Sequence, residues 1–88
     1  MKEFKDLEFG KHSTGMGTSA KMNFDNGYGV SVVFGEQWYS NGIDTYELAV
    51  LHNGSLIYDT HITGDVMGYI SKEKVTEVMK QVQELPNE

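Results

Sequence analysis

The amino-acid sequence predicts an α+β fold, in which a four-stranded antiparallel β-meander packs one face against a C-terminal amphipathic helix. Three Asn-Gly pairs, beginning at Asn26, Asn41 and Asn53, separate segments rich in β-branched and aromatic residues. Asn-Gly is a strong signal for a hairpin turn. The segment after Ser71 instead repeats apolar residues at helical spacing. Because a chain of 88 residues is too short for two cores, we expect a single domain.

The N-terminal segment, residues 1–19, is predicted to be flexible or irregular. It places the single apolar residues Phe4, Leu7 and Phe9 among charged residues, and then becomes rich in Gly, Ser and Thr. The run from Gly15 to Thr18 lacks the Lys of a phosphate-binding loop and precedes a strand, which favours a flexible loop over a phosphate site.

The meander is expected over residues 20–62, and the register of its first hairpin follows from the apolar pattern. A two-residue loop at Asn26-Gly27 would place the apolar face of one strand beside the polar face of the next. A three-residue loop, Asp25 to Gly27, pairs Met22 with Val30 and Ala20 with Val32. We therefore predict a type I turn followed by Gly27 in the left-handed region.

The second hairpin is predicted to turn tightly at Asn41-Gly42. This turn would set Tyr39 opposite Asp44, Trp38 opposite Thr45 and Gln37 opposite Tyr46. The third strand, residues 46–51, then turns at Asn53-Gly54 into a fourth strand, residues 56–61.

This register predicts one apolar face for the helix to cover, and a second face that is only partly polar. The expected members of the first face include Val30, Val32, Ala49 and Leu51. The second face would carry Val33, Leu48, Val50 and Ile57 beside Ser31 and Asp59. Leaving four apolar side chains in water is costly. Their cover would be the N-terminal apolar residues folded back, a second copy of the chain, or a different partner.

The helix is expected over residues 71–85. Ser71 is the predicted N-cap, Glu73 suits the positive end of the helix dipole, and Ile70 can pack onto Val75. Pro86 ends the helix. The residues of the apolar stripe are Val75, Val78, Met79, Val82 and Leu85.

Composition excludes some function classes. The chain has 13 Asp and Glu against 7 Lys and no Arg, with a net charge of −6, so direct nucleic-acid binding is disfavoured. A basic partner would be attracted instead. The absence of Cys suits a reducing cytoplasm, and the N-terminus lacks the apolar run of a signal peptide or membrane helix.

A partner-binding surface is predicted at the second hairpin, where aromatic and acidic residues gather. Rigid aromatic side chains bring contact area at low entropic cost. The competing interpretation is aromatic packing across the strands, which only stabilises the hairpin. The predicted contact residues are Glu36, Trp38, Tyr39, Asp44, Tyr46 and Glu47.

Sites for metal or catalysis are weakly indicated. Asp59 and His61 would share a strand face with Asp65 nearby, but two convergent ligands do not make a metal site. Ser31 could approach His52 if the second turn is tight, yet nothing supplies an oxyanion hole. We therefore expect no enzyme activity, cofactor or metal.

The run from Asn26 to Val33, and the run from Tyr46 to Gly54 with 58–60 and 65–66 following, resemble small accessory proteins of tailed bacteriophages and prophages. The similarity covers roughly residues 20–85 and consists of turns and strands, so it transfers no catalytic residue. It implies a protein made in the cytoplasm of an infected bacterium, where small acidic domains often bind and block a host protein, including nucleases of defence systems.

The leading hypothesis is therefore a non-enzymatic, anti-CRISPR-like inhibitor that presents an acidic, aromatic surface to a nucleic-acid-binding host enzyme or complex. The first alternative is a self-associating structural protein, in which the second sheet face pairs with a second copy. The second alternative is a small-ligand-binding protein with its site near Asp59, His61 and Asp65. No membrane partner is expected.

Overall fold

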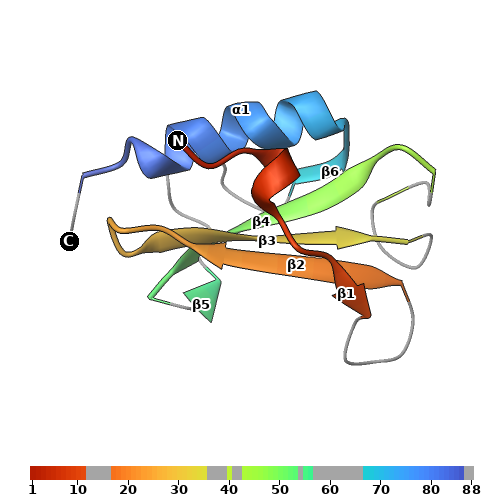
Figure 1. Cartoon of the computed structure of the whole chain (residues 1–88), viewed down its shortest axis with the longest axis horizontal. Coiled ribbons are helices and arrows are strands. Elements are labelled where there is room, and N and C mark those ends of the chain that lie inside the picture. The colour runs from red at the N-terminus through yellow and green to blue at the C-terminus, as the bar shows by residue number, and fades with distance from the viewer. Residues whose placement is uncertain (12–16, 36–39, 41–42, 54, 57–66, 87–88) are drawn as a thin grey trace.

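The computed structural model of the chain describes residues 1–11, 17–35, 40, 43–53, 55–56 and 67–86. Within these residues an antiparallel sheet carries one α-helix, α1, on one face, with the short 3-10 helix η1 beside it (Figure 1). The α+β class and the helix on one sheet face are as predicted. The element bounds are η1 Phe4–Asp6, β1 Gly10–Lys11, β2 Thr18–Asn23, β3 Tyr28–Phe34, β4 Tyr46–His52, β5 Ser55–Leu56, β6 Met67–Ile70 and α1 Lys72–Gln83.

The described strands are six rather than the four predicted. They follow the order β1-β2-β3-β4-β5, and β6 also pairs with β4. Two strands were not predicted: β1 adds a short edge beside β2, and β6 occupies part of the connector that was expected to be only turns. Of the predicted fourth strand, only Leu56 falls among the described residues, in β5.

The first hairpin has the predicted register. Met22 pairs with Val30 and Ala20 with Val32. The amide of Gly27 donates to the carbonyl of Phe24 at 3.3 Å, and Gly27 has a φ of 87°. The three-residue loop with a left-handed glycine is therefore confirmed, and it holds the apolar residues of β2 and β3 on one face.

The second hairpin differs from the prediction. Val32 pairs with Leu48 and Ser31 with Ala49, so Tyr46 lies beside Phe34, with the two rings 4.9 Å apart, and not beside Gln37. The connection between β3 and β4 is thus longer than a tight turn. Ser40 links the two ends of this connection. Its hydroxyl donates to the carbonyl of Thr45 at 2.6 Å and accepts from the amide of Gly35 at 3.2 Å.

This register exchanges the two faces of β4 relative to the prediction. The displacement is by an odd number of residues, and an odd shift moves each side chain to the opposite face. Leu48 and Val50 therefore face α1 and join the core, whereas Ala49 and Leu51 are buried on the other face, outside that cluster. The core cluster contains Leu7, Ala20, Val30, Val32, Leu48, Val50, Val75, Val78, Met79, Val82 and Leu85.

Helix α1 begins and packs as predicted. The Ser71 side chain accepts a hydrogen bond from the amide of Lys74 at 3.2 Å, as an N-cap does. All five residues of the predicted apolar stripe are buried. Ile70 packs against the same cluster from the partly buried rim.

The C-terminal end of α1 is held by the turn between β2 and β3. Asn26 is buried in this turn, and its side-chain Nδ2 donates to the carbonyls of Val82 at 2.9 Å and Leu85 at 3.0 Å. The carbonyls at a helix end have no partner within the helix. Asn26 therefore caps α1 from a distant part of the chain.

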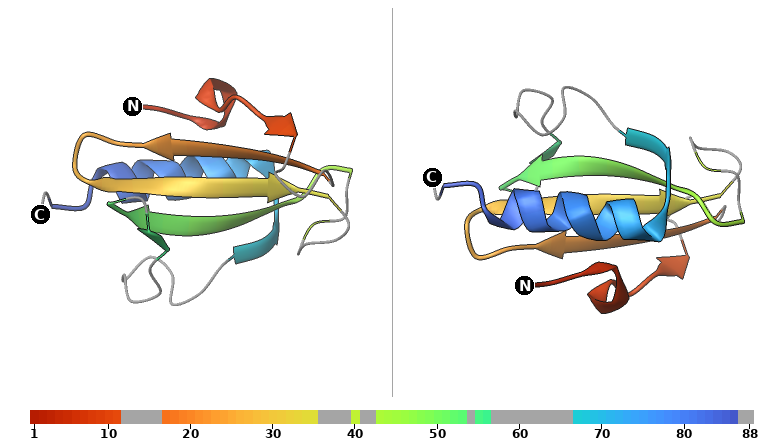
Figure 2. Two further views of the ribbon diagram at one scale, coloured as in Figure 1. Left: turned by 90° about the horizontal axis from the view of Figure 1, so that it is seen from below. Right: turned by 90° about the horizontal axis from the view of Figure 1, so that it is seen from above.

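The part of the N-terminal segment that contains η1 lies beside α1, on the same side of the sheet as the helix (Figure 1 and Figure 2). Of the three covers considered for Leu48 and Val50, the structure shows the N-terminal apolar residues folded back, but on the α1 side of the sheet and not on the opposite face. Leu7 is buried in the core, and Phe4 and Phe9 pack against it. The described part of this segment is thus more ordered than predicted, because its apolar residues complete the core next to α1.

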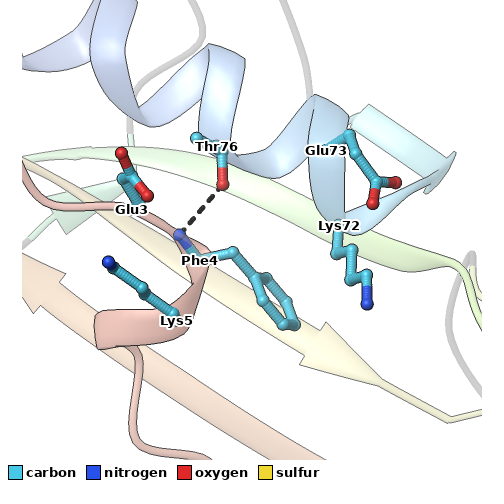
Figure 3. A pocket seen from close by; sticks show the side chains of 6 residues that line it. All are labelled: Glu3, Phe4, Lys5, Lys72, Glu73 and Thr76. Carbon is cyan, nitrogen blue, oxygen red and sulfur yellow. Dashed lines mark hydrogen bonds between the residues drawn. The ribbon is translucent and has the colours of Figure 1, made fainter.

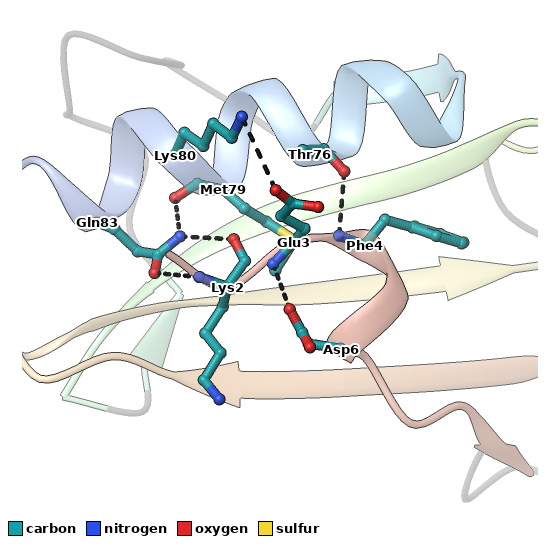
Figure 4. A network of polar contacts seen from close by, with 8 residues as sticks. All are labelled: Lys2, Glu3, Phe4, Asp6, Thr76, Met79, Lys80 and Gln83. Carbon is teal, nitrogen blue, oxygen red and sulfur yellow. Dashed lines mark hydrogen bonds and ion pairs between the residues drawn. The ribbon is translucent and has the colours of Figure 1, made fainter.

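Polar contacts fasten the N-terminal segment to one side of α1 (Figure 4). The side-chain amide of Gln83 donates to the carbonyl of Lys2 and accepts from its amide, both at 2.9 Å. The amide of Phe4 donates to the Thr76 hydroxyl at 3.0 Å. Gln83 thus pairs with the Lys2 backbone as a neighbouring strand would.

Candidate functional site

The six predicted contact residues do not form one described surface. Glu36, Trp38 and Tyr39 lie outside the described residues. Tyr46 and Glu47 are successive residues of β4 and so point to opposite faces of the sheet. Of the three predicted contact residues that the structure describes, Asp44 is exposed in the connection before β4, and Tyr46 and Glu47 are half-buried.

Tyr46 is instead the centre of an aromatic cluster. Its ring lies 5.0 Å from that of Phe4, 5.9 Å from Phe9 and 4.9 Å from Phe34. Such spacings are typical of favourable edge-to-face and tilted aromatic pairs. Tyr46 therefore joins the N-terminal segment to the sheet, and the interpretation as aromatic packing holds for this residue.

Burial raises the pKa of the Tyr46 hydroxyl above its ordinary value of 10.0, and the nearby carboxylate of Asp44 raises it further. The folded state therefore binds the phenol proton more tightly than the unfolded chain does. This contribution to stability is complete below the unfolded pKa and is lost as the pH rises through the folded pKa. Ionised Tyr46 would place a charge inside the aromatic cluster.

Above about pH 10, the ordinary tyrosine pKa, we expect the melting temperature of the Tyr46→Phe variant to fall less steeply with pH than that of the wild type. Melting temperatures of the wild type and the variant would be compared across the alkaline range, and phenolate absorbance would follow the titration. Melting curves that fall in parallel for the two proteins would contradict this expectation.

A second region combines exposed apolar side chains with unusual backbone. Ile43 is 79% exposed and Tyr69 is 61% exposed, which makes them large apolar residues left in water among the described residues. Pairing of Tyr46 with Ile70 brings the chain before β4 next to the junction of β6 and α1. Both segments lie at the same end of the sheet (Figure 2). We call Ile43, Asp44 and Tyr69 the loop end.

Tyr69 adopts a left-handed backbone, with a φ of 54°. The pairing of β6 with β4 shifts register between Tyr46 and Leu48, so Tyr69 stands at a bulge. A bulky residue at positive φ is strained, and such strain persists where the surrounding structure imposes it, often at functional positions. Sequence reasoning missed Tyr69, because nothing around it predicts a strand or a bulge.

A groove lies between η1 and the first turns of α1, with a volume of about 410 Å³. The Phe4 ring lies between the 3-10 helix and Lys72, and two lysines and two glutamates surround it (Figure 3). The Thr76 hydroxyl in the groove already accepts the Phe4 amide. Balanced charge and an open shape favour no particular ligand. The lining residues are Glu3, Phe4, Lys5, Lys72, Glu73 and Thr76.

A smaller groove of about 290 Å³ lies between two hairpin turns at the opposite end of the sheet, and is lined by Asn23, Phe24, Gly27 and Asn53. The amide of Asn53 donates to the carbonyl of Gly27 at 2.8 Å, which joins the two turns. This contact is structural.

The described residues bring together none of the weakly indicated chemical sites. Ser31 pairs with Ala49, whereas His52 pairs with Tyr28 three residues away along β3 and on the other face, so the expected approach of Ser31 to His52 is wrong. Asp59, His61 and Asp65 lie outside the described residues. In the described part of the chain, no group of three or more His, Asp or Glu is placed to hold a metal ion.

No protein-family model, curated protein or solved structure matches the chain. Within the described residues, no helix is long and apolar enough to cross a membrane.

Proposed function

We propose that the protein is a non-enzymatic binding protein of the phage accessory type, which acts in the cytoplasm of an infected bacterium and inhibits a host protein through the loop end. The observation that supports this proposal most directly is the exposure of Ile43 and Tyr69 at one end of the sheet. Exposed apolar and aromatic residues with polar surroundings are typical of protein contact surfaces.

The sequence connects the loop end with the predicted aromatic residues. Trp38 and Tyr39 belong to the same connection between β3 and β4 as Ile43 and Asp44. Tyr46 is half-buried, and its ring packs against that of Phe4. The proposed contact surface is therefore the loop end with Glu36, Trp38 and Tyr39, and not the face of the hairpin.

The charge of the chain favours a basic partner. With 13 acidic residues against 7 lysines, the protein is attracted to surfaces that bind nucleic acid. An acidic domain seated on such a surface would exclude the nucleic acid. A counter-defence role, in which the partner is a nuclease or its complex, follows from this chemistry together with the phage resemblance.

Tyr69→Gly tests the proposal, because it separates binding from folding. Glycine adopts a positive φ without strain, so we expect the variant to keep its fold and to gain about 0.5–1 kcal/mol of stability. Loss of an exposed aromatic anchor should weaken partner binding by about 30-fold or more. Thermal melting measures the first effect, and affinity capture from bacterial lysate followed by titration with the recovered protein measures the second.

Paired acidic variants provide the matched control. Asp44→Asn at the loop end should weaken capture, whereas Asp25→Asn, an exposed acid in the turn at the opposite end, should leave it unchanged. Trp38→Ala with Tyr39→Ala should abolish capture while preserving the circular dichroism spectrum. If Tyr69→Gly and the double variant both fold and still bind with wild-type affinity, the proposal is wrong.

The alternative of self-association loses its main support. It relied on Leu48 and Val50 lying on an uncovered face, and both are buried beneath α1. Light scattering at high protein concentration would detect dimers directly.

A further inference from the structure

Asn26 is a buried, fully hydrogen-bonded side chain that directly precedes a glycine. It is buried, and every hydrogen on its side-chain amide is used, since Nδ2 donates to the carbonyls of both Val82 and Leu85. Its Oδ1 accepts from the amide of Tyr28 at 3.1 Å. It is also followed by Gly27, and the Asn-Gly pair is chemically the most reactive sequence for loss of the asparagine amide.

The reaction needs only water and a base. The Gly27 backbone nitrogen loses its proton and bonds to Cγ of Asn26, the bond from Cγ to Nδ2 breaks, and the nitrogen leaves as ammonia. Water then opens the resulting succinimide ring at either carbonyl and gives an aspartyl or an isoaspartyl residue. Glycine favours the ring closure because it has no side chain to obstruct the attacking nitrogen.

The folded structure opposes each part of this step. The amide that must leave is held by two carbonyls at the end of α1. The attacking nitrogen donates its own hydrogen to the carbonyl of Phe24. Turning Cγ toward that nitrogen would break the contacts of Asn26 with α1, so the C-terminal end of the helix must first separate from the turn.

The product cannot restore the closed structure. An aspartyl carboxylate has no hydrogen to donate to the carbonyls of Val82 and Leu85, and it would face the negative end of the helix dipole. An isoaspartyl residue adds a backbone atom to the three-residue loop whose length sets the register of β2 and β3. Both products therefore leave α1 without its cap.

We propose that Asn26 is a deamidation site that the docked end of α1 protects, so that each prolonged opening of this end can convert the chain irreversibly into a form that no longer closes. The modification limits the lifetime of the folded protein, and its rate reports how often α1 opens.

The test measures deamidation of the full chain at mildly alkaline pH, by mass spectrometry of the peptide that contains Asn26. A synthetic peptide covering residues 23–29 gives the intrinsic rate in each buffer. We expect Asn26 to react at least about tenfold more slowly in the native protein than in the peptide, because local opening limits reaction at protected sites. The native rate should rise with urea below the unfolding transition, and approach the peptide rate beyond it.

Two variants test whether the docking of α1 controls the deamidation rate of Asn26. Val82→Ala removes buried contacts of α1 and should accelerate the reaction, whereas Lys21→Ala, on an exposed position of β2, should not. Because Asn41 and Asn53 also precede glycine, mass spectrometry must first identify which charge variant is deamidated at Asn26. That form should melt at a lower temperature than the unmodified chain. Equal rates in the native protein and the peptide, or an unchanged melting temperature after deamidation, would overturn the proposal.

Discussion

Replacing Leu48 by Ala is expected to lower the free energy of unfolding by about 2–5 kcal/mol, among the largest effects of any single truncation in this chain. Leu48 has no exposed surface and lies in β4, beneath α1, between β3 and β6. Neighbours on both sides restrict collapse around the missing side chain, so a cavity would remain. Urea unfolding, followed by circular dichroism, measures the loss.

The matched control is Ile43→Ala, which deletes a similar side chain at the loop end. Because Ile43 is 79% exposed, this variant should change stability by less than about 0.5 kcal/mol. The comparison also tests the register of β4, since the predicted register would have placed Leu48 away from the helix. A loss below about 1 kcal/mol for Leu48→Ala would contradict the packing described here.

Asn26→Asp is expected to produce a loss of similar size through a different cause. The carbonyls of Val82 and Leu85 lose their donor, at about 1–3 kcal/mol for each buried group left unpaired. A carboxylate at the negative end of α1 adds about 0.3–1 kcal/mol. This substitution changes very little volume, so cavity formation does not contribute.

The pH dependence of this variant identifies the cause. Burial and the helix end should raise the pKa of the new carboxyl group above the ordinary value of about 4. The penalty of its charge should therefore decrease as the pH falls through this raised pKa, and should be gone below about 4. Asn23→Asp, an exposed position on β2, is the control and should remain within about 0.5 kcal/mol of wild type. If both variants unfold at the same urea concentration, the capping role of Asn26 is wrong.

The local elements were predictable because local chemistry determines them. In the first hairpin, only a three-residue loop places Ala20, Met22, Val30 and Val32 on the same face of the sheet. The helix has an N-cap at Ser71 and a single apolar stripe. Both are short-range patterns that leave little choice of register or face.

The register of β4 was not predictable from its own residues. Leu48, Ala49, Val50 and Leu51 are all apolar and all buried, so the strand lacks the alternation that would distinguish its faces. The strong turn signal at Asn41-Gly42 then favoured a tight turn between β3 and β4. The hydrogen bonds of Ser40 to Gly35 and Thr45 belong to a longer connection. Strand β6 was missed because it contains Gly68 and a left-handed Tyr69.

The candidate surface was predictable only in part. Asp44 is exposed as expected. Tyr46 instead packs against aromatic residues of the N-terminal segment, which are distant in sequence. Tyr69 gives no signal before the bulge is seen. Positions that depend on contacts between remote segments cannot be read from local patterns.

The pairing of Gln83 with the backbone of Lys2 has a consequence for biosynthesis. A ribosome makes residue 2 long before residue 83, so the nascent chain exposes Phe4 and Leu7 until α1 has emerged. Contacts this remote along the chain slow the search for the native state. Until residues 2 and 83 meet, the newly made protein is therefore exposed to proteases and chaperones.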